Sequence, residues 1–134
     1  MSAPVFHVLP GIAAPISPSS HASEAGGFVF ITGQLGRDLN DPDAPLPDGI
    51  EAQTQRALAN LAYVLQALGL GMRDLVSVRV FLTHFKRDYA AMNGIYAGHF
   101  ATTDRPTRTC IGVTDLARDA LVEIDGIAFR RRGE

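Results

Sequence analysis

The spacing of apolar residues changes along this chain, and those changes constrain the fold more than any other feature. Leucines recur at intervals of three and four between residues 58 and 68, which predicts an amphipathic helix that ends at Gly69. Between residues 75 and 82, apolar residues alternate with other types, which is the spacing of a strand. Helical spacing returns between residues 86 and 100. Helices and strands in this order predict a fold of the α+β class.

Several other segments are predicted to be strands. Residues 28–32 are β-branched or aromatic, and residues 107–113 and 121–129 are extended runs. A further strand is expected near residues 6–9. The remainder of residues 1–25 is rich in Pro, Ser and Ala and is predicted to be loop.

The start of the first helix is indicated by Asp48 and Glu51, which have the spacing of a capping box. The helix is therefore expected to begin near Gly49. The segment before it, residues 38–48, contains three Pro and four Asp residues. This composition predicts a surface loop.

The economical packing of these elements is a mixed sheet with two helices on one face. The other face of the sheet would then be uncovered. Both sides of the strand at residues 28–31 are apolar, with Phe28 and Phe30 on one side and Val29 and Ile31 on the other. We therefore expect the second face of the sheet to pack against another subunit.

Length and charge limit the classes of function. The 134 residues are expected to form a single domain, residues 1–134, that buries roughly 68% of the surface of its unfolded chain. Little mass remains to enclose a deep pocket, so a sizeable ligand site is expected to be shared between subunits.

With 12 Lys and Arg against 14 Asp and Glu, the chain lacks an electrostatic field that would favour nucleic acid or an anionic membrane as a partner. The one basic cluster, Arg130 to Arg132, is typical of a solubilising tail.

The cysteine count and the N-terminus indicate a cytoplasmic protein. Cys110 is the only cysteine, so an intrachain disulfide is excluded and a reducing compartment fits best. The N-terminus lacks a basic region followed by an apolar one, and no apolar run approaches the roughly 18 residues of a membrane span. We expect a protein that is neither exported nor inserted in a membrane.

The motif search argues against several kinds of site. Gly69 and Gly71 begin a dinucleotide fingerprint, but they follow a helix and lead into a strand, which is the wrong order. The four histidines have no spacing that places two on one helix face as ligands, so a metal is not expected. Cys110 lies inside a strand pattern without an adjacent His or Asp, which favours a small buried side chain over a nucleophile.

The most informative stretch contains Arg108 and Glu123. Pro106 forces Arg105 out of helical geometry, so Arg108 projects from the start of a strand, where its planar fork suits a carboxylate. Glu123 lies in a strand pattern among apolar neighbours, and partial desolvation would raise its pKa toward a range useful for acid–base chemistry. A purely structural pairing of Arg108 with Glu123 across neighbouring strands is the alternative.

Five ordered blocks of the sequence are similar to one family. They are ITGQ (Ile31–Gln34), VFLT (Val80–Thr83), MNGIY (Met92–Tyr96), RPTRTC (Arg105–Cys110) and LVEIDGIA (Leu121–Ala128). The match spans nearly the whole chain and resembles the YjgF/YER057c-like, or Rid, family of reactive intermediate deaminases. The resemblance implies a chorismate-mutase-like fold and a homotrimer whose sheets face an inner β-barrel, with three clefts between subunits.

The same resemblance implies an activity and its residues. Family members hydrolyse enamine and imine intermediates such as 2-aminoacrylate, which implies an enzyme similar to 2-iminobutanoate/2-iminopropanoate deaminase without a cofactor. On this resemblance, Arg108 holds the substrate carboxylate and Glu123 assists the attacking water. Gly33 and Cys110 would line the pocket, and Asn93 would support its wall.

One position departs from the family pattern. Many members carry a Tyr in an I-G-P-Y block, and Ser19 stands at the matching position here. The Ser19 hydroxyl is several ångströms shorter, so water or His21 fills the gap, or the pocket accepts a larger substrate. Residues 38–48 border this region in family members. Ser19 favours a second hypothesis, in which the trimer binds small carboxylates or keto acids for regulation and has no catalytic activity.

A third function, RNA cleavage or translation inhibition, has been ascribed to some relatives. The net charge of −2, the absence of Trp and the lack of a basic stripe interleaved with aromatic residues argue against RNA as the main ligand. The identity of the imino acid stays open at this point.

Overall fold

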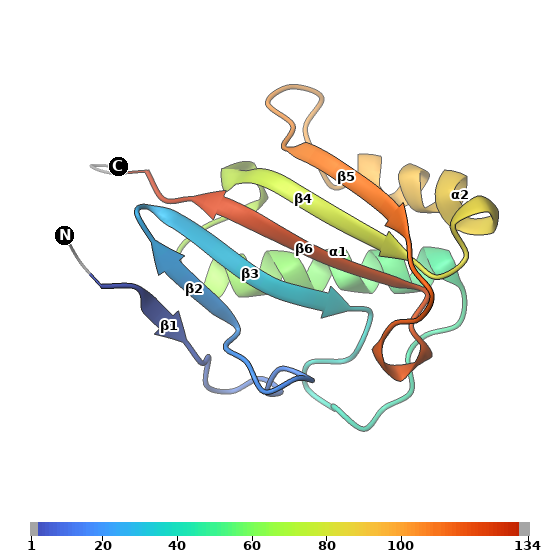
Figure 1. Ribbon diagram of the computed structural model, residues 1–134, viewed down its shortest axis with the longest axis horizontal. Coiled ribbons are helices and arrows are strands. Elements are labelled where there is room, and N and C mark those ends of the chain that lie inside the picture. The colour runs from blue at the N-terminus through green and yellow to red at the C-terminus, as the bar shows by residue number, and fades with distance from the viewer. Residues whose placement is uncertain (1–2, 132–134) are drawn as a thin grey trace.

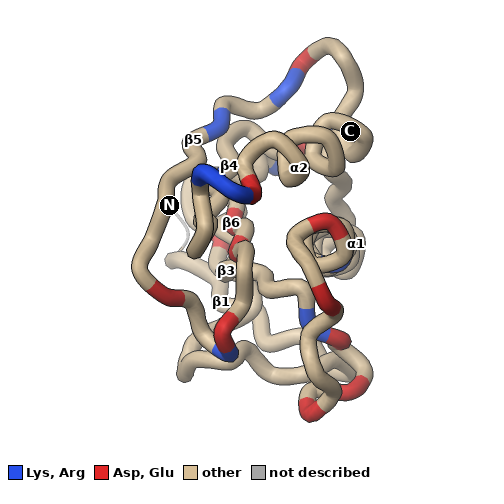
Figure 2. The backbone as a smooth tube through the Cα atoms, turned by 90° about the vertical axis from the view of Figure 1, so that its right-hand side faces the viewer, with Lys and Arg blue, Asp and Glu red and all other residues tan. Residues whose placement is uncertain are grey.

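The chain folds into two layers, a six-stranded sheet and two helices that cover one of its faces (Figures 1 and 2). The computed structural model describes residues 3–131. Its elements are β1 (Val5–His7), β2 (Ala22–Ala25), β3 (Phe28–Leu35), α1 (Ile50–Ala67), β4 (Leu75–Leu82), α2 (Phe85–Ala97), β5 (Thr107–Gly112) and β6 (Val122–Phe129). The predicted architecture, a mixed sheet with both helices on one side, is confirmed.

The strand order β1-β2-β3-β6-β4-β5 places the last strand of the chain in the middle of the sheet. Neighbouring strands are antiparallel, except that β4 and β5 are parallel and are joined through α2. Because β4 lies between them, β5 and β6 are not neighbours. This separation decides where the predicted site residues lie.

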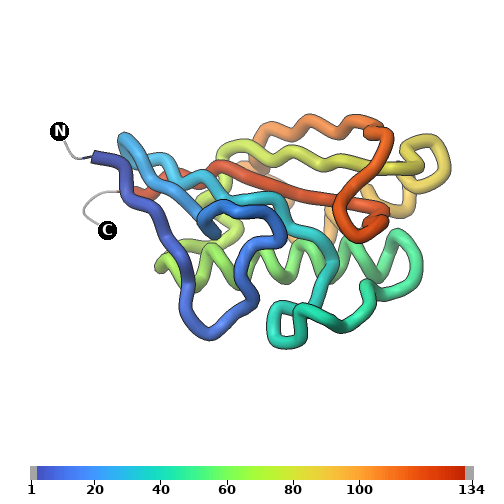
Figure 3. Tube along the Cα trace, turned by 60° about the horizontal axis from the view of Figure 1, so that its bottom comes forward, coloured from blue at the N-terminus to red at the C-terminus, as the bar shows by residue number. Residues whose placement is uncertain are grey.

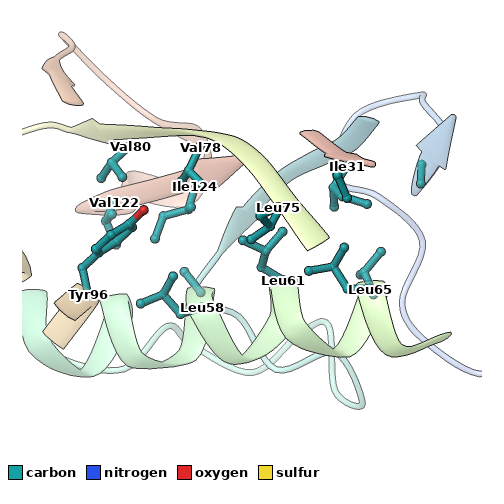
Figure 4. Packing of buried hydrophobic residues seen from close by; sticks show 14 of the residues in the cluster. Ile31, Leu58, Leu61, Leu65, Leu75, Val78, Val80, Tyr96, Val122 and Ile124 are labelled. Atoms are coloured by element: carbon teal, nitrogen blue, oxygen red, sulfur yellow. The ribbon is translucent and has the colours of Figure 1, made fainter. Parts of the chain in front are cut away.

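The leucine stripe of α1 packs as its spacing predicts. Leu58, Leu61 and Leu65 are fully buried in the core between α1 and the sheet, and Tyr96 enters the same core from α2 (Figure 4). Burial of one leucine side chain contributes roughly 1.5–3 kcal/mol, so the stripe fixes α1 beneath the sheet. Within residues 3–131, no helix has the length and apolarity needed to cross a membrane.

The start of α1 differs from the prediction. Its N-cap is Gly49, with a φ of 85°, and no side chain caps the helix by a hydrogen bond. The predicted capping box of Asp48 and Glu51 is therefore wrong. The reason is the left-handed backbone at Gly49, which replaces the extended N-cap conformation that such a box requires.

The strand β2 was predicted to be loop. Its sequence, Ala-Ser-Glu-Ala, has little intrinsic strand propensity, and it becomes a strand because it pairs with β3. Gly26 and Gly27 join the two strands with φ values of 60° and 87°. A two-residue hairpin of type I′ needs positive φ at both positions, which glycine adopts at little cost.

Two bulges also change the predicted strands. β3 was predicted to end at residue 32, but it continues through Gly33 to Leu35, with a shift of register before Gln34. β4 has the predicted bounds, but a second shift near its start leaves Val76 exposed. A bulge adds a residue without a partner, so simple alternation fails there.

The sheet face opposite the helices is exposed, and we call it the open face. Phe28, Phe30 and Phe129 lie on it with 42%, 43% and 39% of their surface exposed. The rings of Phe28 and Phe129 lie 5.2 Å apart. The second face of the sheet is therefore uncovered in one chain, as expected.

Candidate functional site

Glu123 lies on β6 and belongs to the open face, because its neighbours Val122 and Ile124 are buried on the helix side. Its half-buried side chain passes closely over Gly33. A Cβ atom added at position 33 would lie 2.7 Å from Glu123 Cδ, which is closer than such atoms approach in proteins. Gly33 is therefore required by the position of the carboxyl group.

The electrostatic surroundings favour the protonated form of Glu123. Burial is the main cause that raises its pKa, the nearby Asp125 raises it further, and Arg79 acts in the opposite direction. Arg79 is itself paired with Asp125, through Nε–Oδ1 at 3.0 Å and Nη2–Oδ2 at 2.6 Å. No cation within residues 3–131 forms an ion pair with Glu123. Glu123 is thus a carboxyl group suited to receive and return a proton.

A cavity of about 140 Å³ adjoins Glu123, and we call it the Glu123 cavity. Its polar lining includes Ser17, His21, Gln34 and Arg37, and Gly33 also borders it. Ser19 is shorter than the tyrosine of the family pattern, and His21 or water was expected to fill the gap if the pocket does not accept a larger substrate. Its Nδ1 accepts from Leu9 N at 2.9 Å and its Nε2 lies 2.9 Å from Ala13 O, so both nitrogens are committed to the backbone. His21 therefore holds the N-terminal loop with both ring nitrogens while its side chain lines the cavity.

Ser19 lies at the edge of the open face. It borders a shallow depression that Gly33, Arg79 and Asp125 also line. Its hydroxyl is exposed and turns back to Ser17, with 3.1 Å between the two Oγ atoms. Ser19 and Gly33 thus share a surface, although Ser19 is not part of the Glu123 cavity.

Arg108 lies on β5, at the edge of the sheet, and its side chain extends over α2. Its guanidinium carbon lies 4.8 Å from the ring centre of Tyr96 and 5.9 Å from that of Tyr89. Nη2 of Arg108 donates to the Tyr89 hydroxyl at 3.4 Å. Aromatic faces attract a cation without occupying its N–H groups, so most of the donors of Arg108 stay free for an anion.

Asn93 and Cys110 belong to the same side of the molecule as Arg108. Asn93 lies on α2 between Tyr89 and Tyr96, and its Oδ1 is buried without a hydrogen-bond partner in the described chain. Cys110 follows Arg108 by two residues on β5 and packs against the core. Burial is the main cause that raises the pKa of the Cys110 thiol, which argues against a reactive thiolate.

The two predicted catalytic residues do not meet within one chain. Arg108 is paired in register with Val78 and shares its helix-side orientation, whereas Glu123 belongs to the open face. The strand β4 also separates β5 from β6. A structural pairing of Arg108 with Glu123 across neighbouring strands is therefore excluded within the chain. We call the two groups the Arg108 half-site (Tyr89, Asn93, Tyr96, Arg108, Cys110) and the Glu123 half-site (Ser19, Gly33, Glu123).

Sequence reasoning missed the aromatic support of Arg108. The helical spacing of residues 86–100 assigns Tyr89 and Tyr96 no role beside the arginine. Their spacing of seven residues does put both rings on one helix face. Only the packing of β5 against α2 brings Arg108 over them.

The basic end of the chain is bound to the fold. Arg130 donates to both carboxylate oxygens of Glu24, at 3.2 and 2.7 Å, and to Leu68 O at 2.8 Å. Arg131 Nε lies 3.8 Å from Asp74 Oδ1. The interpretation as a solubilising tail is therefore wrong for Arg130, because it ties β6 to β2 and to the end of α1. Arg132 lies outside the described residues.

A metal site of the usual kind is not formed by residues 3–131. No group of three or more His, Cys, Asp or Glu side chains in that range converges as a metal ion would need.

The chain is similar to a set of known proteins over nearly its full length. The sequence profile of the family described as endoribonuclease L-PSP matches residues 11–130. A RutC family protein of Synechocystis (slr0709) is 38% identical over 115 residues, which cover 86% of this chain and 88% of that protein.

Two further similarities concern proteins whose names state a function or a ligand. A 2-iminobutanoate/2-iminopropanoate deaminase of Dermatophagoides farinae is 33% identical over 113 residues, or 84% of this chain and 86% of that protein. The crystal structure of E. coli TdcF with bound serine superimposes with a TM-score of 0.82 at 28% identity, and the match covers 95% of this chain and 99% of TdcF.

Proposed function

Because the chain belongs to the Rid family, the family of YjgF, endoribonuclease L-PSP and RutC proteins, we propose that it is a cofactor-free deaminase of reactive imino acids. The products would be a 2-keto acid and ammonia. The proposed enzyme is a homotrimer, and its sites lie in clefts between subunits. The name of the deaminase of Dermatophagoides farinae and the serine bound to TdcF support a small substrate of the amino-acid type.

The observation that carries this proposal is the separation of Arg108 from Glu123. Hydrolysis of an imino acid needs a group that binds the carboxylate and a group that moves protons. One chain holds these two groups on different faces of its sheet. A neighbouring copy that covers the open face and brings its own β5 edge would place Arg108 of one subunit near Glu123 of the next. The exposed Phe28, Phe30 and Phe129 favour such a contact.

Arg108 binds the substrate carboxylate in this mechanism. Its guanidinium offers two parallel N–H groups to the two carboxylate oxygens, and the rings of Tyr89 and Tyr96 limit its motion. Carboxylate binding fixes C2 of the substrate, because that carbon is attached directly to the carboxyl carbon. The imine carbon is thereby oriented for attack.

Glu123 moves the protons. Its carboxylate takes a proton from water as the water oxygen bonds to C2, and the former imine nitrogen receives that proton and becomes an amine. The hydroxyl proton of the resulting 2-amino-2-hydroxy acid then passes through Glu123 to the amine. The C2–N bond breaks, ammonia leaves and a carbonyl forms, so one water is consumed for each ammonia released. A raised pKa suits this exchange, because the group must gain and lose a proton in turn.

The test is keto-acid release from imines that an amino-acid oxidase generates in the assay. The wild-type protein is expected to accelerate release, and Arg108→Met is expected to lose at least about a hundredfold of that acceleration. Arg105→Met is the matched control, because Arg105 lies in the same motif but, among residues 3–131, its side chain donates a hydrogen bond to Ala101 O alone. Equal rates for wild type and Arg108→Met would rule the assignment out.

A second candidate is a regulatory trimer that binds keto acids without turnover. The position of Ser19 favours it, since the hydroxyl is exposed and turned toward Ser17 instead of the Glu123 cavity. Calorimetry with 2-oxobutyrate separates the two candidates. Binding that depends on Arg108, in a protein that leaves imine hydrolysis at its spontaneous rate, would establish the regulator.

A further inference from the structure

Arg37 is a buried cation, and the part of the chain that the structure describes gives it no anionic partner. It follows β3, is 8% exposed, and donates from Nη2 to Ala14 O at 2.7 Å. No Asp or Glu within residues 3–131 forms an ion pair with it. Burial of a guanidinium is costly when no carboxylate offsets the lost hydration. The proposed mechanism gives Arg37 no task, so its position calls for another explanation.

A neighbouring positive charge adds to the free-energy cost of burying Arg37. Arg118 is the charged neighbour that acts on it, and burial together with Arg118 lowers the pKa of Arg37. Arg118 is held beside it because its guanidinium donates to the carbonyls of Pro42 and Ala44, at 3.0 and 2.8 Å. Asp38, the next residue in the chain, instead accepts a hydrogen bond from Asn40 N at 2.8 Å. Within residues 3–131, no carboxylate therefore forms an ion pair that offsets the positive charge of Arg37.

Arg37 faces the Glu123 cavity. Two loops lie side by side there, one before β2 and one before α1 (Figure 3), and Ala13 N donates to Leu39 O at 3.0 Å between them. Arg37 and Glu123 both line this cavity of about 140 Å³. Three residues within 3–131, Thr54, Asn93 and Tyr96, have a fully buried side-chain N or O atom without a hydrogen-bond partner, and Arg37 is not among them. The Arg37 side chain therefore lines the cavity without a fully buried, unpartnered N–H group.

We propose that Arg37 binds a second carboxylate of the substrate and makes the enzyme selective for dicarboxylic imino acids. The inference rests on the proposed function, because Glu123 in the same cavity would carry out the hydrolysis. Arg108 would hold the carboxylate next to C2, and Arg37 would hold the one at the other end of the substrate. A planar guanidinium suits a carboxylate, which accepts two parallel hydrogen bonds from it.

The test compares two imines in the same assay, one generated from glutamate and one from 2-aminobutyrate. In Arg37→Met, kcat/KM for the glutamate-derived imine is expected to fall at least about tenfold, while the other imine changes by less than about twofold. Met has a similar length and no charge, so the variant is expected to fold, and a thermal melt checks this.

Arg56→Met is the control, because Arg56 is exposed on α1 and forms no ion pair in the described chain. Equal effects of Arg37→Met on both imines, or no effect on either, would overturn the inference and leave the proposed function standing.

A binding measurement separates the inference from the proposed function. Wild type is expected to bind 2-oxoglutarate more tightly than 2-oxobutyrate, and Arg37→Met is expected to lose this preference. If the preference depends on Arg37 but neither imine is hydrolysed faster, the proposed function fails and the second carboxylate site stands. If inorganic phosphate raises the Tm of wild type through Arg37 and 2-oxoglutarate does not, the site is for phosphate and the inference is wrong.

Discussion

The Arg108 half-site and the Glu123 half-site are built by different physical means. Arg108 extends from an edge strand, keeps access to solvent, and is held by the faces of Tyr89 and Tyr96. Glu123 lies on a central strand, half-buried against the backbone of Gly33. In the first half-site, the aromatic rings limit the motion of the Arg108 side chain but leave most of its N–H groups available to a ligand. The second depends on close approach, because the half-buried Glu123 side chain passes directly over the backbone of Gly33.

This difference assigns binding and proton transfer to different parts of the proposed enzyme. The partly exposed Arg108 keeps N–H donors available, which is what recognition of a carboxylate requires. A partly buried carboxyl has its pKa raised by the loss of hydration, which is what proton transfer near neutral pH requires. Substitutions in the Glu123 half-site should therefore change kcat. Conservative substitutions in the Arg108 half-site should instead change KM for the substrate.

The largest effect is expected from mixing two inactive variants. Arg108→Met and Glu123→Gln should each lose at least about a hundredfold of activity, because each lacks one half of every site. In a closed ring assembled at random from equal amounts of both, a site has an intact arginine with probability one half and an intact glutamate with probability one half. Activity should therefore return to about a quarter of the wild-type level after unfolding and joint refolding. Activity that stays at the level of the separate variants would contradict a site shared between subunits.

The next largest effect is expected from Gly33→Ala. The new methyl group would occupy the space of Glu123 Cδ, so the carboxyl group must move and kcat should fall about 10- to 100-fold. Binding of 2-oxobutyrate should change little, because Arg108 is untouched. Gly71→Ala is the control, since a Cβ atom there meets nothing within 4 Å. A wild-type kcat in Gly33→Ala would show that the position of Glu123 does not matter.

A smaller effect concerns stability and pH. The pKa of Glu123 is raised in the folded chain, so between its unfolded and folded pKa values the folded state binds more protons, and stability falls as pH rises through that window. Glu123→Gln has no titrating carboxyl group at this position, so its stability does not fall in this window. The variant should have a slightly higher Tm than wild type near neutral pH, and the difference should vanish below about pH 4, under the unfolded pKa. Thermal melts of both proteins from pH 4 to pH 8 measure it, and a difference that grows as pH falls would contradict the raised pKa.

The smallest effect is expected from Tyr89→Phe. The variant keeps the aromatic face beneath Arg108 and loses only the hydrogen bond of 3.4 Å, which is long and exposed. KM should rise by no more than about threefold while kcat is unchanged. Tyr89→Ala, which also removes the ring, is the comparison and should raise KM further. An equal KM for both variants would mean that the ring does not hold the arginine.

Local patterns predicted most of the elements. The stripe from Leu58 to Leu65 and the alternation between residues 75 and 82 give α1 and β4, because burial of regularly spaced apolar side chains is strong enough to fix each element. The strand β2 was not predictable in this way. Its residues carry no strand signal of their own and depend on pairing with β3.

The candidate site was predicted in its residues but not in its arrangement. The chemistry of Arg108 and Glu123 identifies them as candidates, and the strand pattern correctly places Glu123 among apolar neighbours, which are the buried Val122 and Ile124. The burial of Arg37 could not be predicted, because nothing in a sequence distinguishes a buried arginine from an exposed one. Its burial depends on contacts with the loop that contains Ala14, and that loop is distant in sequence.

The sequence by itself thus determined the α+β class, the helix that covers the sheet, and the side chains able to bind an anion or move a proton. These follow from short-range spacing and from the chemistry of individual residues. Only the tertiary structure decided that β6 enters the sheet between β3 and β4, and so separates Glu123 from Arg108. Strand order is set by pairing between segments far apart in the chain, and the apolar spacing within each strand is compatible with more than one order.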